Sequence, residues 1–515
     1  MNEYGFSGIT SKLLIARKKT EKWQIDSFLN DNLNDLHNPA DIPGIDDVKR
    51  RIMEHIKWGS FICNFSDFDV DGVTSAAILS KALDKLKANY FVLVSDRFRD
   101  GYSLSKKAID IMDENGVGLC ITSDCGISSI EEIEYANSLG IEVIVLDHHL
   151  NENPPDTLFL DLKVNKGDYP FDLLSGAGIV WKLCQHLLND NFYEVLDLVA
   201  LSSIADVVPL FNENRIIVKE GLKHIENTKN IGLQELLKIS GVYKGITTGD
   251  IGYKTAPLIN AQGRLGNNQI SYELLTTNDQ TRAKEIVLKL KEVNDKRKEI
   301  TNETFNKIKD KVDDSKNIIV EMVDIPKGIT GLVAGRVQEH FKKPALIFNK
   351  GLSGSMRSYK PLTTDIVLSE INHLLESGGG HMCVLGASLK PGKFNEVQKT
   401  LYKLAEGLEY ETIKYDLEVS PGQITIDLIN ELEQLQPYGM GFPRPKFITK
   451  VNDISNLTLL KKEHIKFNIG DKECIGFFMP NKYDVIKDKP FSMVYSPGVN
   501  SWRGKNTVQL MIKDI

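Results

Sequence analysis

The chain has 515 residues, of which 41% are hydrophobic and 26% are charged, and its formal net charge is −7. The length predicts about three domains, and the composition is that of a folded protein. No apolar run approaches the roughly 18–20 residues that span a bilayer, and the acidic balance excludes a protein that coats nucleic acid along its whole surface.

The N-terminus lacks an apolar core followed by a small-residue cleavage site, and the six cysteines include no CxxC pair. We therefore expect a cytoplasmic protein with reduced thiols, without structural zinc and without a membrane partner. Carboxylates that hold cations count as negative in the net charge, so a nuclease remains compatible with it. An acidic body with a confined basic groove is expected.

Residues 1–50 form an N-terminal segment, after which short apolar runs alternate with helical segments. Runs that are apolar almost throughout predict strands of a parallel sheet covered on both faces. The predicted strands are 60–65, 90–95, 118–122, 141–146 and 158–164. Helical character continues through 176–205 and 215–240, so one α/β domain is expected at 51–278.

Beyond this domain the pattern changes twice. A charged segment at 279–312 carries apolar residues at helical spacing and predicts a long connecting helix. A second α/β domain, with a glycine-rich stretch near its end, is expected at 313–408. Residues 409–515 contain short alternating strands separated by turns, the pattern of a five-stranded barrel such as an OB-fold.

Acidic residues follow three predicted strands of the first domain, and a fourth acidic segment ends an apolar helical stretch. These segments begin at Asp67, Asp124, Asp147 and Asp206. Because the carboxyl ends of parallel strands share one edge of the sheet, the first three segments meet there. Each signal alone is weak, since an aspartate after a strand is often only a helix N-cap.

Several carboxylates in one cleft repel each other, and divalent cations relieve that repulsion. Oxygen ligands together with an imidazole favour Mn²⁺ or Mg²⁺. A calcium loop is the alternative for Asp67-Phe68-Asp69-Val70-Asp71-Gly72, but the twelfth position of such a loop is a glutamate, and here it is Ile78.

Six separated motifs, in order along the chain, make the sequence resemble the DHH phosphoesterase superfamily, and within it the RecJ-like exonucleases. The matching segments are Asp67-Phe68-Asp69-Val70-Asp71-Gly72, Asp124-Cys125-Gly126, Asp147-His148-His149, Ala205-Asp206-Val207-Val208-Pro209-Leu210, residues 256–264 and Gly378-Gly379-Gly380-His381. Further matches lie at 436–439 and 501–505. The resemblance implies a parallel-sheet DHH domain, a connecting helix, an α/β DHHA1 domain and a C-terminal OB-like β-barrel.

The resemblance also implies a site with two cations, Mn²⁺ or Mg²⁺. Asp67 and Asp124 would hold one ion, and Asp69, His148 and Asp206 the other, with Asp124 bridging. The catalytic residues would be His149, as a donor to the phosphate or the leaving group, and Asp147, which would fix the histidine tautomers.

Substrate contacts follow from the same resemblance. The implied substrate-binding residues are Asn260, Arg264, Arg357, Ser358, Gly379, Gly380 and His381. In the barrel, Trp502, Arg503 and Lys505 are candidate DNA-binding groups, whereas Phe477, Phe478 and Tyr495 lie on alternating strands and are expected in its core. We expect the barrel to hold long single strands. Removing the residues from about 411 onward would then weaken their binding and reduce processivity, but leave cleavage of very short oligonucleotides largely intact.

Two departures from the family pattern affect the site. A histidine usually precedes the first aspartate, but this chain has Cys63, Asn64 and Phe65 there, so one ion is expected to bind more weakly. A histidine before Gly328 is also missing, because the chain reads Asp324-Ile325-Pro326-Lys327-Gly328.

The function implied is that of a 5′→3′ exonuclease specific for single-stranded DNA, acting in DNA repair and recombination. Its partners would be single-stranded DNA and single-strand-binding protein or other repair factors. Two alternatives stay open: a phosphodiesterase of short oligonucleotides or nucleotides from the same superfamily, and an inactive relative that only binds single strands. The barrel favours the exonuclease over the first, and the retained carboxylates favour it over the second.

Overall fold

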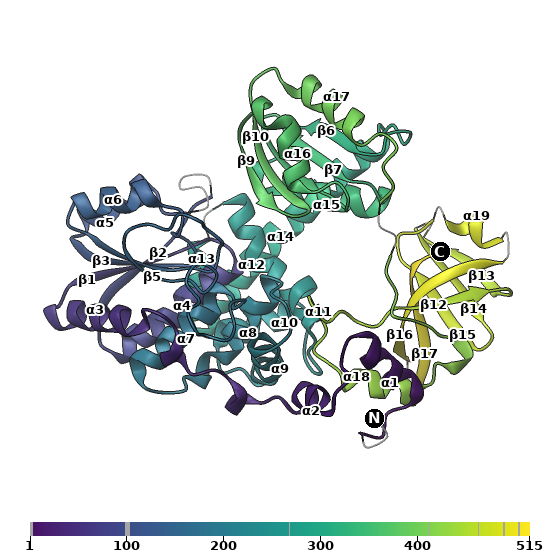
Figure 1. Ribbon diagram of the computed structural model, residues 1–515, viewed down its shortest axis with the longest axis horizontal. Helices are drawn as coiled ribbons and strands as arrows, with labels where there is room; N and C mark the ends of the chain where they lie inside the picture. The colour runs from purple at the N-terminus through teal and green to yellow at the C-terminus, as the bar shows by residue number, and fades with distance from the viewer. Residues whose placement is uncertain are drawn as a thin grey trace.

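The computed structural model describes residues 4–97, 103–266, 268–410, 413–461, 463–480, 482–487, 490–502 and 505–515, with only the backbone of His381, Trp502 and Lys505. Its chain forms two α/β domains and a β-barrel domain (Figure 1). A long helix leads from the first α/β domain into the second.

The first domain is built on a fully parallel sheet in the order β2-β1-β3-β4-β5. The strands are β1 Phe61–Ser66, β2 Asn89–Val94, β3 Val117–Ser123, β4 Glu142–Leu146 and β5 Leu158–Leu160. The last strand is shorter than the predicted 158–164, because the Asp161 carboxylate accepts hydrogen bonds from the amides of Lys163 (2.8 Å) and Val164 (3.3 Å) and turns the chain.

Helices cover both faces of this sheet, which explains why its strands are apolar throughout. One face packs in a large core with α3 Ile45–Trp58, α4 Val70–Lys85, α7 Gly176–Leu188 and α8 Leu196–Ala205. The other face packs with α5 Lys106–Glu114 and α6 Ile130–Ser138. The remaining helices are α9 Glu213–Glu226, α10 Ile231–Ile239, α11 Thr248–Asp250, the π-helical turn η5 Ile251–Thr255, α12 Ala256–Leu265 and α13 Gln269–Thr276.

The connecting helix α14 spans Gln280–Lys309, close to the predicted 279–312. It leads into a mixed sheet in the order β6-β7-β8-β10-β9. These strands are β6 Ile319–Val323, β7 Ala345–Asn349, β8 Ser353–Arg357, β9 Leu375–His381 and β10 Val384–Leu389; the turn η6 Lys327–Ile329 and the helices α15 Thr330–Phe341, α16 Thr364–Ile371 and α17 Phe394–Leu404 accompany them. The predicted second α/β architecture is confirmed.

The C-terminal sheet has the order β11-β12-β16-β17-β15-β14-β13. Its strands are β11 Leu417–Glu418, β12 Phe447–Val451, β13 Ser455–Leu460, β14 His464–Ile469, β15 Lys472–Gly476, β16 Phe491–Trp502 and β17 Lys505–Asp514, with helices α18 Ile426–Glu433 and α19 Lys482–Lys487. Only residues 452–454 separate β12 from β13, which lie toward opposite ends of the sheet order. The sheet is therefore wrapped into a barrel, and β12 with β13 acts as one bent strand, which gives the five expected strands plus β11.

The first two helices of the chain belong to the barrel domain rather than to the domain that follows them. Helices α1 Gly8–Ala16 and α2 Lys22–Asn30 contribute Leu13, Leu14 and Phe28 to the barrel's apolar core. Figure 1 shows both helices beside α18, far along the chain. The N-terminal segment therefore closes the barrel domain against the rest of the molecule.

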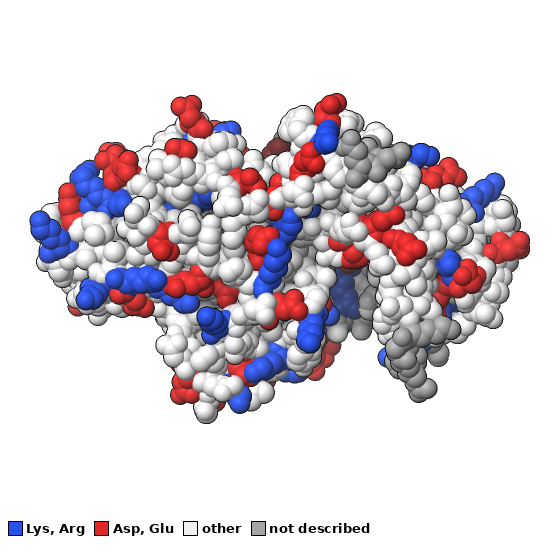
Figure 2. All heavy atoms as spheres, turned by 90° about the horizontal axis from the view of Figure 1, so that it is seen from below, with Lys and Arg blue, Asp and Glu red and all other residues white. Residues whose placement is uncertain are grey.

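The face of the molecule drawn in Figure 2 carries acidic and basic side chains intermixed, without a continuous basic surface. Among the described residues, no helix has the length and apolarity required to cross a membrane. All six cysteines are free thiols, and five of them are buried.

Candidate active site

The candidate site lies at the carboxyl edge of the parallel sheet, where the strand order reverses. The chain passes from β1 to β2 on one side and then to β3 on the other, so the ends of β1 and β3 flank the switch point at which such sheets bind ligands. Asp67 and Asp69 follow β1, Asp124 follows β3, and Asp147 and His148 follow β4.

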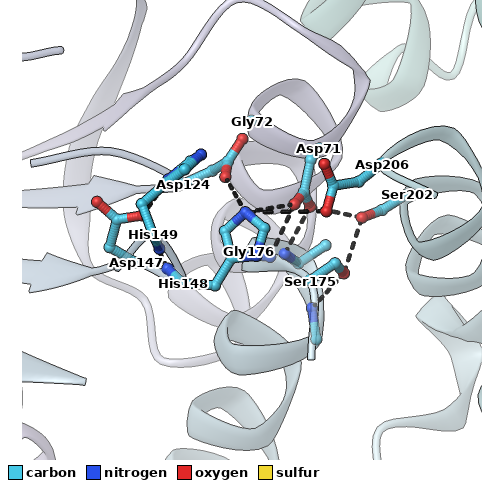
Figure 3. Close-up of polar contacts among 12 residues, drawn as sticks. Asp71, Gly72, Asp124, Asp147, His148, His149, Ser175, Gly176, Ser202 and Asp206 are labelled. Carbon is cyan, nitrogen blue, oxygen red and sulfur yellow. Dashed lines mark hydrogen bonds and ion pairs between the residues drawn. The ribbon is translucent and has the colours of Figure 1, made fainter. Parts of the chain in front are cut away.

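Asp206, at the C-terminal end of α8, joins this edge from the helical layer, and His148 lies between the carboxylates (Figure 3). Nε2 of His148 is 3.1 Å from Oδ1 of Asp124, 3.6 Å from Oδ2 of Asp71 and 3.9 Å from Oδ2 of Asp206. The predicted metal-binding residues are thus brought together in space.

Ligand atoms within 4.8 Å of one another form three groups among the described residues. They are Asp67, Asp69 and Asp124; Asp71, His148 and Asp206; and Asp124, His148 and His149. This grouping differs from the division expected from the sequence, in which Asp69 accompanied His148 and Asp206.

Asp71 is the member of the cluster that the sequence reasoning did not single out. Its carboxylate is buried and accepts hydrogen bonds from the amides of Gly176 (2.7 Å) and Ala177 (2.8 Å), at the N-terminus of α7, and from the hydroxyl of Ser202 (2.5 Å). The positive end of the α7 dipole faces this carboxylate and helps to hold it at the N-terminus of the helix. The sequence signal that could have identified Asp71 is its position as the third aspartate of the motif at 67–72.

Local backbone geometry fixes the other carboxylates. Asp69 caps α4, accepting hydrogen bonds from the amides of Asp71 (2.8 Å) and Gly72 (3.2 Å). Asp124 has φ 61°, a left-handed conformation that aspartate and asparagine tolerate better than most residues. A Cβ at position 176 would lie 2.8 Å from the Cβ of Asp124, so only glycine lets α7 approach this closely.

Burial and mutual repulsion destabilise the charged carboxylates. The pKa of Asp67 and the pKa of Asp124 are raised well above the usual range, first by burial and then by neighbouring carboxylates. The same causes raise the pKa of Asp206 to about 8 and outweigh the attraction of His149 and Lys163. Within the described part of the chain, no lysine or arginine forms an ion pair with these three groups.

A divalent cation fits this donor set. Oδ1 of Asp124 is a buried carboxylate oxygen that accepts no hydrogen bond from the described residues. Burial lowers the pKa of His148 to about 4, so its imidazole is neutral and can serve as a ligand. Carboxylate oxygens with one imidazole suit Mn²⁺ or Mg²⁺, and a cation would offset the repulsion.

His149 and Asp147 form a pair at the rim of the cluster. Oδ1 of Asp147 lies 2.7 Å from Nδ1 of His149 and also accepts a hydrogen bond from the amide of His148 (2.7 Å). Burial opposes the charge on His149, but Asp147 outweighs it and raises the pKa of His149 to about 9. The half-exposed imidazolium can donate a hydrogen bond to an anion. Asp147 orients the ring of His149 and the backbone of His148.

Cys63, Asn64 and Phe65, the positions of the missing first family histidine, are all buried. Phe65 and Cys63 lie in the apolar core beneath α5 and α6, and the amide of Asn64 donates to the carbonyl of Ala76 (2.9 Å) on the opposite face. None of the three side chains belongs to the groups of possible metal ligands. The weaker binding of one ion stays a prediction.

A second polar pocket of about 360 Å³ lies on the second α/β domain. Its lining consists of Lys327, Thr330, Ser353, Gly354, Ser355, Ser377, Gly378, Gly379, Gly386, Ala387 and Ser388. Gly379 was expected in the site, and Gly380 follows it in β9. A Cβ at position 380 would lie 2.0 Å from the carbonyl oxygen of Val384, so this strand pairing requires glycine.

Two serines near this pocket have different environments. The hydroxyl of Ser358, an expected substrate contact, donates to the carbonyl of Leu362 inside the domain. Ser355 lines the pocket, with its hydroxyl 3.1 Å from that of Thr330. Arg357 lies on the same strand as Ser355, and its Nη2 would be 3.2 Å from a Cβ at position 331.

Asn260 and Arg264, both on α12, connect the carboxylate cluster of the first domain with the second α/β domain. Oδ1 of Asn260 accepts a hydrogen bond from the amide of Val70 (3.3 Å) at the start of α4, beside the carboxylates. Nη1 of Arg264 donates to the carbonyl of Gly328 (3.2 Å), and a Cβ at position 328 would lie 2.2 Å from the carbonyl oxygen of Arg264. The segment that lacks the family histidine is therefore a contact between the α/β domains.

Among the barrel's predicted DNA-binding residues, Arg503 lies outside the described residues, as do the side chains of Trp502 and Lys505. The side chain of His381, on β9, also lies outside them. Tyr495 is buried as expected, but the expectation that Phe477 and Phe478 lie in the core is wrong, because they are 46% and 62% exposed. Their rings pack edge-on against His464, at centroid distances of 5.3 and 4.7 Å.

Comparisons with known families cover all three folded units. The profile of the DHH family, N-terminal domain, matches residues 61–204, that of the DHHA1 domain matches 315–407, and that of the RecJ OB domain matches 415–514.

Curated relatives match the chain over most of its length. The single-stranded-DNA-specific exonuclease RecJ of Bacillus subtilis strain 168 is 30% identical over 98% of this chain and 67% of the relative. The Escherichia coli K12 protein of the same name is 29% identical over 92% and 90%. A putative single-strand DNA-specific exonuclease of Bacillus phage SPbeta is 27% identical over 100% and 96%.

Solved structures show the same arrangement. RecJ from Thermus thermophilus in complex with Mn²⁺ matches 98% of this chain and 75% of that one, with a TM-score of 0.85 and 25% identity. An exonuclease RecJ bound to manganese matches 72% of this chain and 96% of that one, with a TM-score of 0.64 and 29% identity.

Proposed function

The chain belongs to the RecJ family of single-stranded-DNA-specific exonucleases, and we propose that it removes nucleotides from the 5′ end of single-stranded DNA with two divalent cations. Its reaction is metal-dependent phosphodiester hydrolysis. The observation that carries the proposal is the cluster of buried carboxylates around His148. The match to the RecJ OB domain favours it over a hydrolase of short oligonucleotides, and the retained carboxylates favour it over an inactive binding protein.

Asp67, Asp69, Asp71, Asp124, His148 and Asp206 would hold the cations, with Asp124 shared by two of the three groups. A bound divalent cation supplies Lewis-acid activation of water and neutralises charge on the phosphate. The α7 N-terminus and Ser202 hold Asp71 in place, and Asp69 is fixed by its cap of α4, so the ligands are preorganised.

The protein's own groups handle the charge of the scissile phosphate. His149, kept cationic by Asp147, donates a hydrogen bond to a phosphate oxygen or a proton to the leaving oxygen. On the facing domain, Lys327, Thr330, Ser355 and the amides of the glycine-rich strand offer donors to a phosphate.

The barrel domain would provide the grip on the single strand. Exposed aromatic rings stack on bases without sequence preference, and Phe477, Phe478 and His464 offer such a surface. Single-strand-binding protein or other repair factors would act at the same DNA ends, in DNA repair and recombination.

End-labelled oligonucleotides test this proposal. Single-stranded and double-stranded DNA and RNA of about 50 nucleotides would be incubated with Mn²⁺ or Mg²⁺, with the Asp124→Asn variant as the inactive control. We expect a 5′ label to appear first as mononucleotide, from single-stranded DNA only. Loss of a 3′ label first would contradict the polarity, and cleavage restricted to fragments of a few nucleotides would favour the short-oligonucleotide hydrolase.

A further inference from the structure

Asp206 begins a short segment with an unusual backbone, residues 206–211, which we call the Asp206 strap. Val207 follows with φ 59° and is 61% exposed, although β-branched residues rarely adopt this left-handed conformation. A strained conformation persists only where the surrounding structure enforces it. The strap therefore requires support from outside α8.

That support comes from the barrel domain. The amide of Leu210 donates a hydrogen bond to the carbonyl of Met440 (2.7 Å), in a tight turn closed by hydrogen bonds between Gly439 and Phe442 of 3.0 and 3.2 Å. We call residues 435–442 the buttress loop. A Cβ at position 439 would lie 2.6 Å from Cδ1 of Leu210, so the loop and the strap are in close contact.

The buttress loop is itself held by Arg215, a buried, positively charged side chain of the first domain. The guanidinium of Arg215, on α9, donates to the carbonyls of Leu435 (3.1 Å), Gln436 (3.0 Å) and Pro437 (3.2 Å). It also lies 3.7 Å from the ring centroid of Phe28 on α2. Because Arg215 is only 2% exposed, it loses its solvation and depends on these carbonyls.

We infer that the buttress loop positions Asp206, so that docking of the barrel domain sets the affinity of the cation held by Asp206. The chain of contacts runs from Arg215 to the carbonyls of 435–437, through the turn at 439–442, and by the Met440 carbonyl to the strap. The inference rests on the proposed role of Asp206 as a metal ligand. The barrel domain then takes part in building the metal site as well as in holding DNA.

Gly439→Ala tests the inference, since its methyl group must displace Leu210. Gly422→Ala is the matched control, because a Cβ there meets only Oγ of Ser420, at 3.9 Å. Mn²⁺ binding to each full-length variant would be measured by titration calorimetry, and the Mn²⁺ dependence of hydrolysis would be followed well below the unfolding temperature. We expect Gly439→Ala to weaken one of the Mn²⁺ binding events about tenfold and to regain most of its rate at high Mn²⁺, while Gly422→Ala behaves as the unmodified protein.

A compensating variant distinguishes a changed position of Asp206 from a general loss of stability. Gly439→Ala combined with Leu210→Ala makes room for the added methyl group and should restore Mn²⁺ affinity even where both changes lower the unfolding temperature. Gly439→Ala with the Mn²⁺ affinity of Gly422→Ala would overturn the inference. Asp206→Asn distinguishes a failure of this inference from a failure of the proposed function. Unchanged Mn²⁺ binding in that variant would show that Asp206 is not a metal ligand.

Discussion

Nε2 of His148 lies 3.1 Å from Oδ1 of Asp124, and that oxygen accepts no hydrogen bond from the described residues. The two side chains follow neighbouring parallel strands, β4 and β3, so their proximity comes directly from the topology of the sheet. A neutral imidazole nitrogen and a buried carboxylate oxygen at this distance can both bind the same cation.

Asp124→Asn should reduce hydrolysis of single-stranded DNA by on the order of 10³-fold or more, because it removes the carboxylate shared by two of the ligand groups. Asparagine keeps the left-handed backbone that alanine would strain. In metal-free buffer the same variant should unfold at a higher temperature, since it removes a buried charge that repels its neighbours. Near-normal hydrolysis would exclude Asp124 from the metal site.

Ser355→Ala and Ser358→Ala form a matched pair on the second α/β domain. Losing a hydrogen bond to a phosphate costs about 1.5–3 kcal/mol, so Ser355→Ala should lower kcat/KM about 10- to 150-fold. Ser358→Ala should instead lower the unfolding temperature and leave KM unchanged, because its hydroxyl donates to Leu362 inside the domain. Steady-state kinetics and thermal unfolding distinguish the two; the reverse pattern would relocate the phosphate contact to Ser358.

Replacing Phe477 and Phe478 together by alanine should weaken binding of single-stranded DNA. Stacking of one base is worth about 1–3 kcal/mol, so the affinity should fall at least about fivefold, as measured by fluorescence anisotropy without divalent cations. Trp58→Ala, which removes an equally exposed aromatic ring on α3, is the control. Equal affinities of the two variants would exclude the aromatic surface as a DNA grip.

Asp161→Asn should stabilise the protein in a pH-dependent way. Burial, followed by repulsion from Asp147, raises the pKa of Asp161 to about 7, against the hydrogen bonds from the amides of Lys163 and Val164. The charged form thus penalises the folded state, with no penalty below about pH 4 and the full penalty above pH 7. Urea unfolding should show a gain on the order of 2–4 kcal/mol at pH 8 and almost none at pH 4. A gain equal at both pH values would mean that charge is not its cause.

Periodicity and strand ends predicted the architecture and the meeting of Asp67, Asp124 and His148, because both are consequences of local pattern and parallel topology. Asp71 was overlooked because it lies inside α4, and its partners Gly176 and Ser202 come from later helices. The sequence did not identify Ser355, because the face of β8 that lines the pocket depends on packing, which a short alternating segment does not reveal.

Long-range contacts account for the largest difference between the prediction from the sequence and the structure. The barrel was predicted only to hold long single strands, yet Arg215 is buried against carbonyls of 435–437, and α1 and α2 complete the barrel's core. A chain cut at residue 411 would leave this arginine without its carbonyl partners. No local pattern pairs an arginine on one helix with carbonyls of a distant turn.

The packing of α1 and α2 into the barrel also sets the order of events during synthesis. Leu13, Leu14 and Phe28 leave the ribosome before the two α/β domains, but α18 and Phe442, against which α1 and Phe28 pack, leave it after these domains. The two α/β domains can fold in the interval, while these apolar side chains remain in water. An interrupted chain would expose them permanently and become a substrate for chaperones and proteases. Synthesis of the barrel domain is therefore the step that lets α1 and α2 fold.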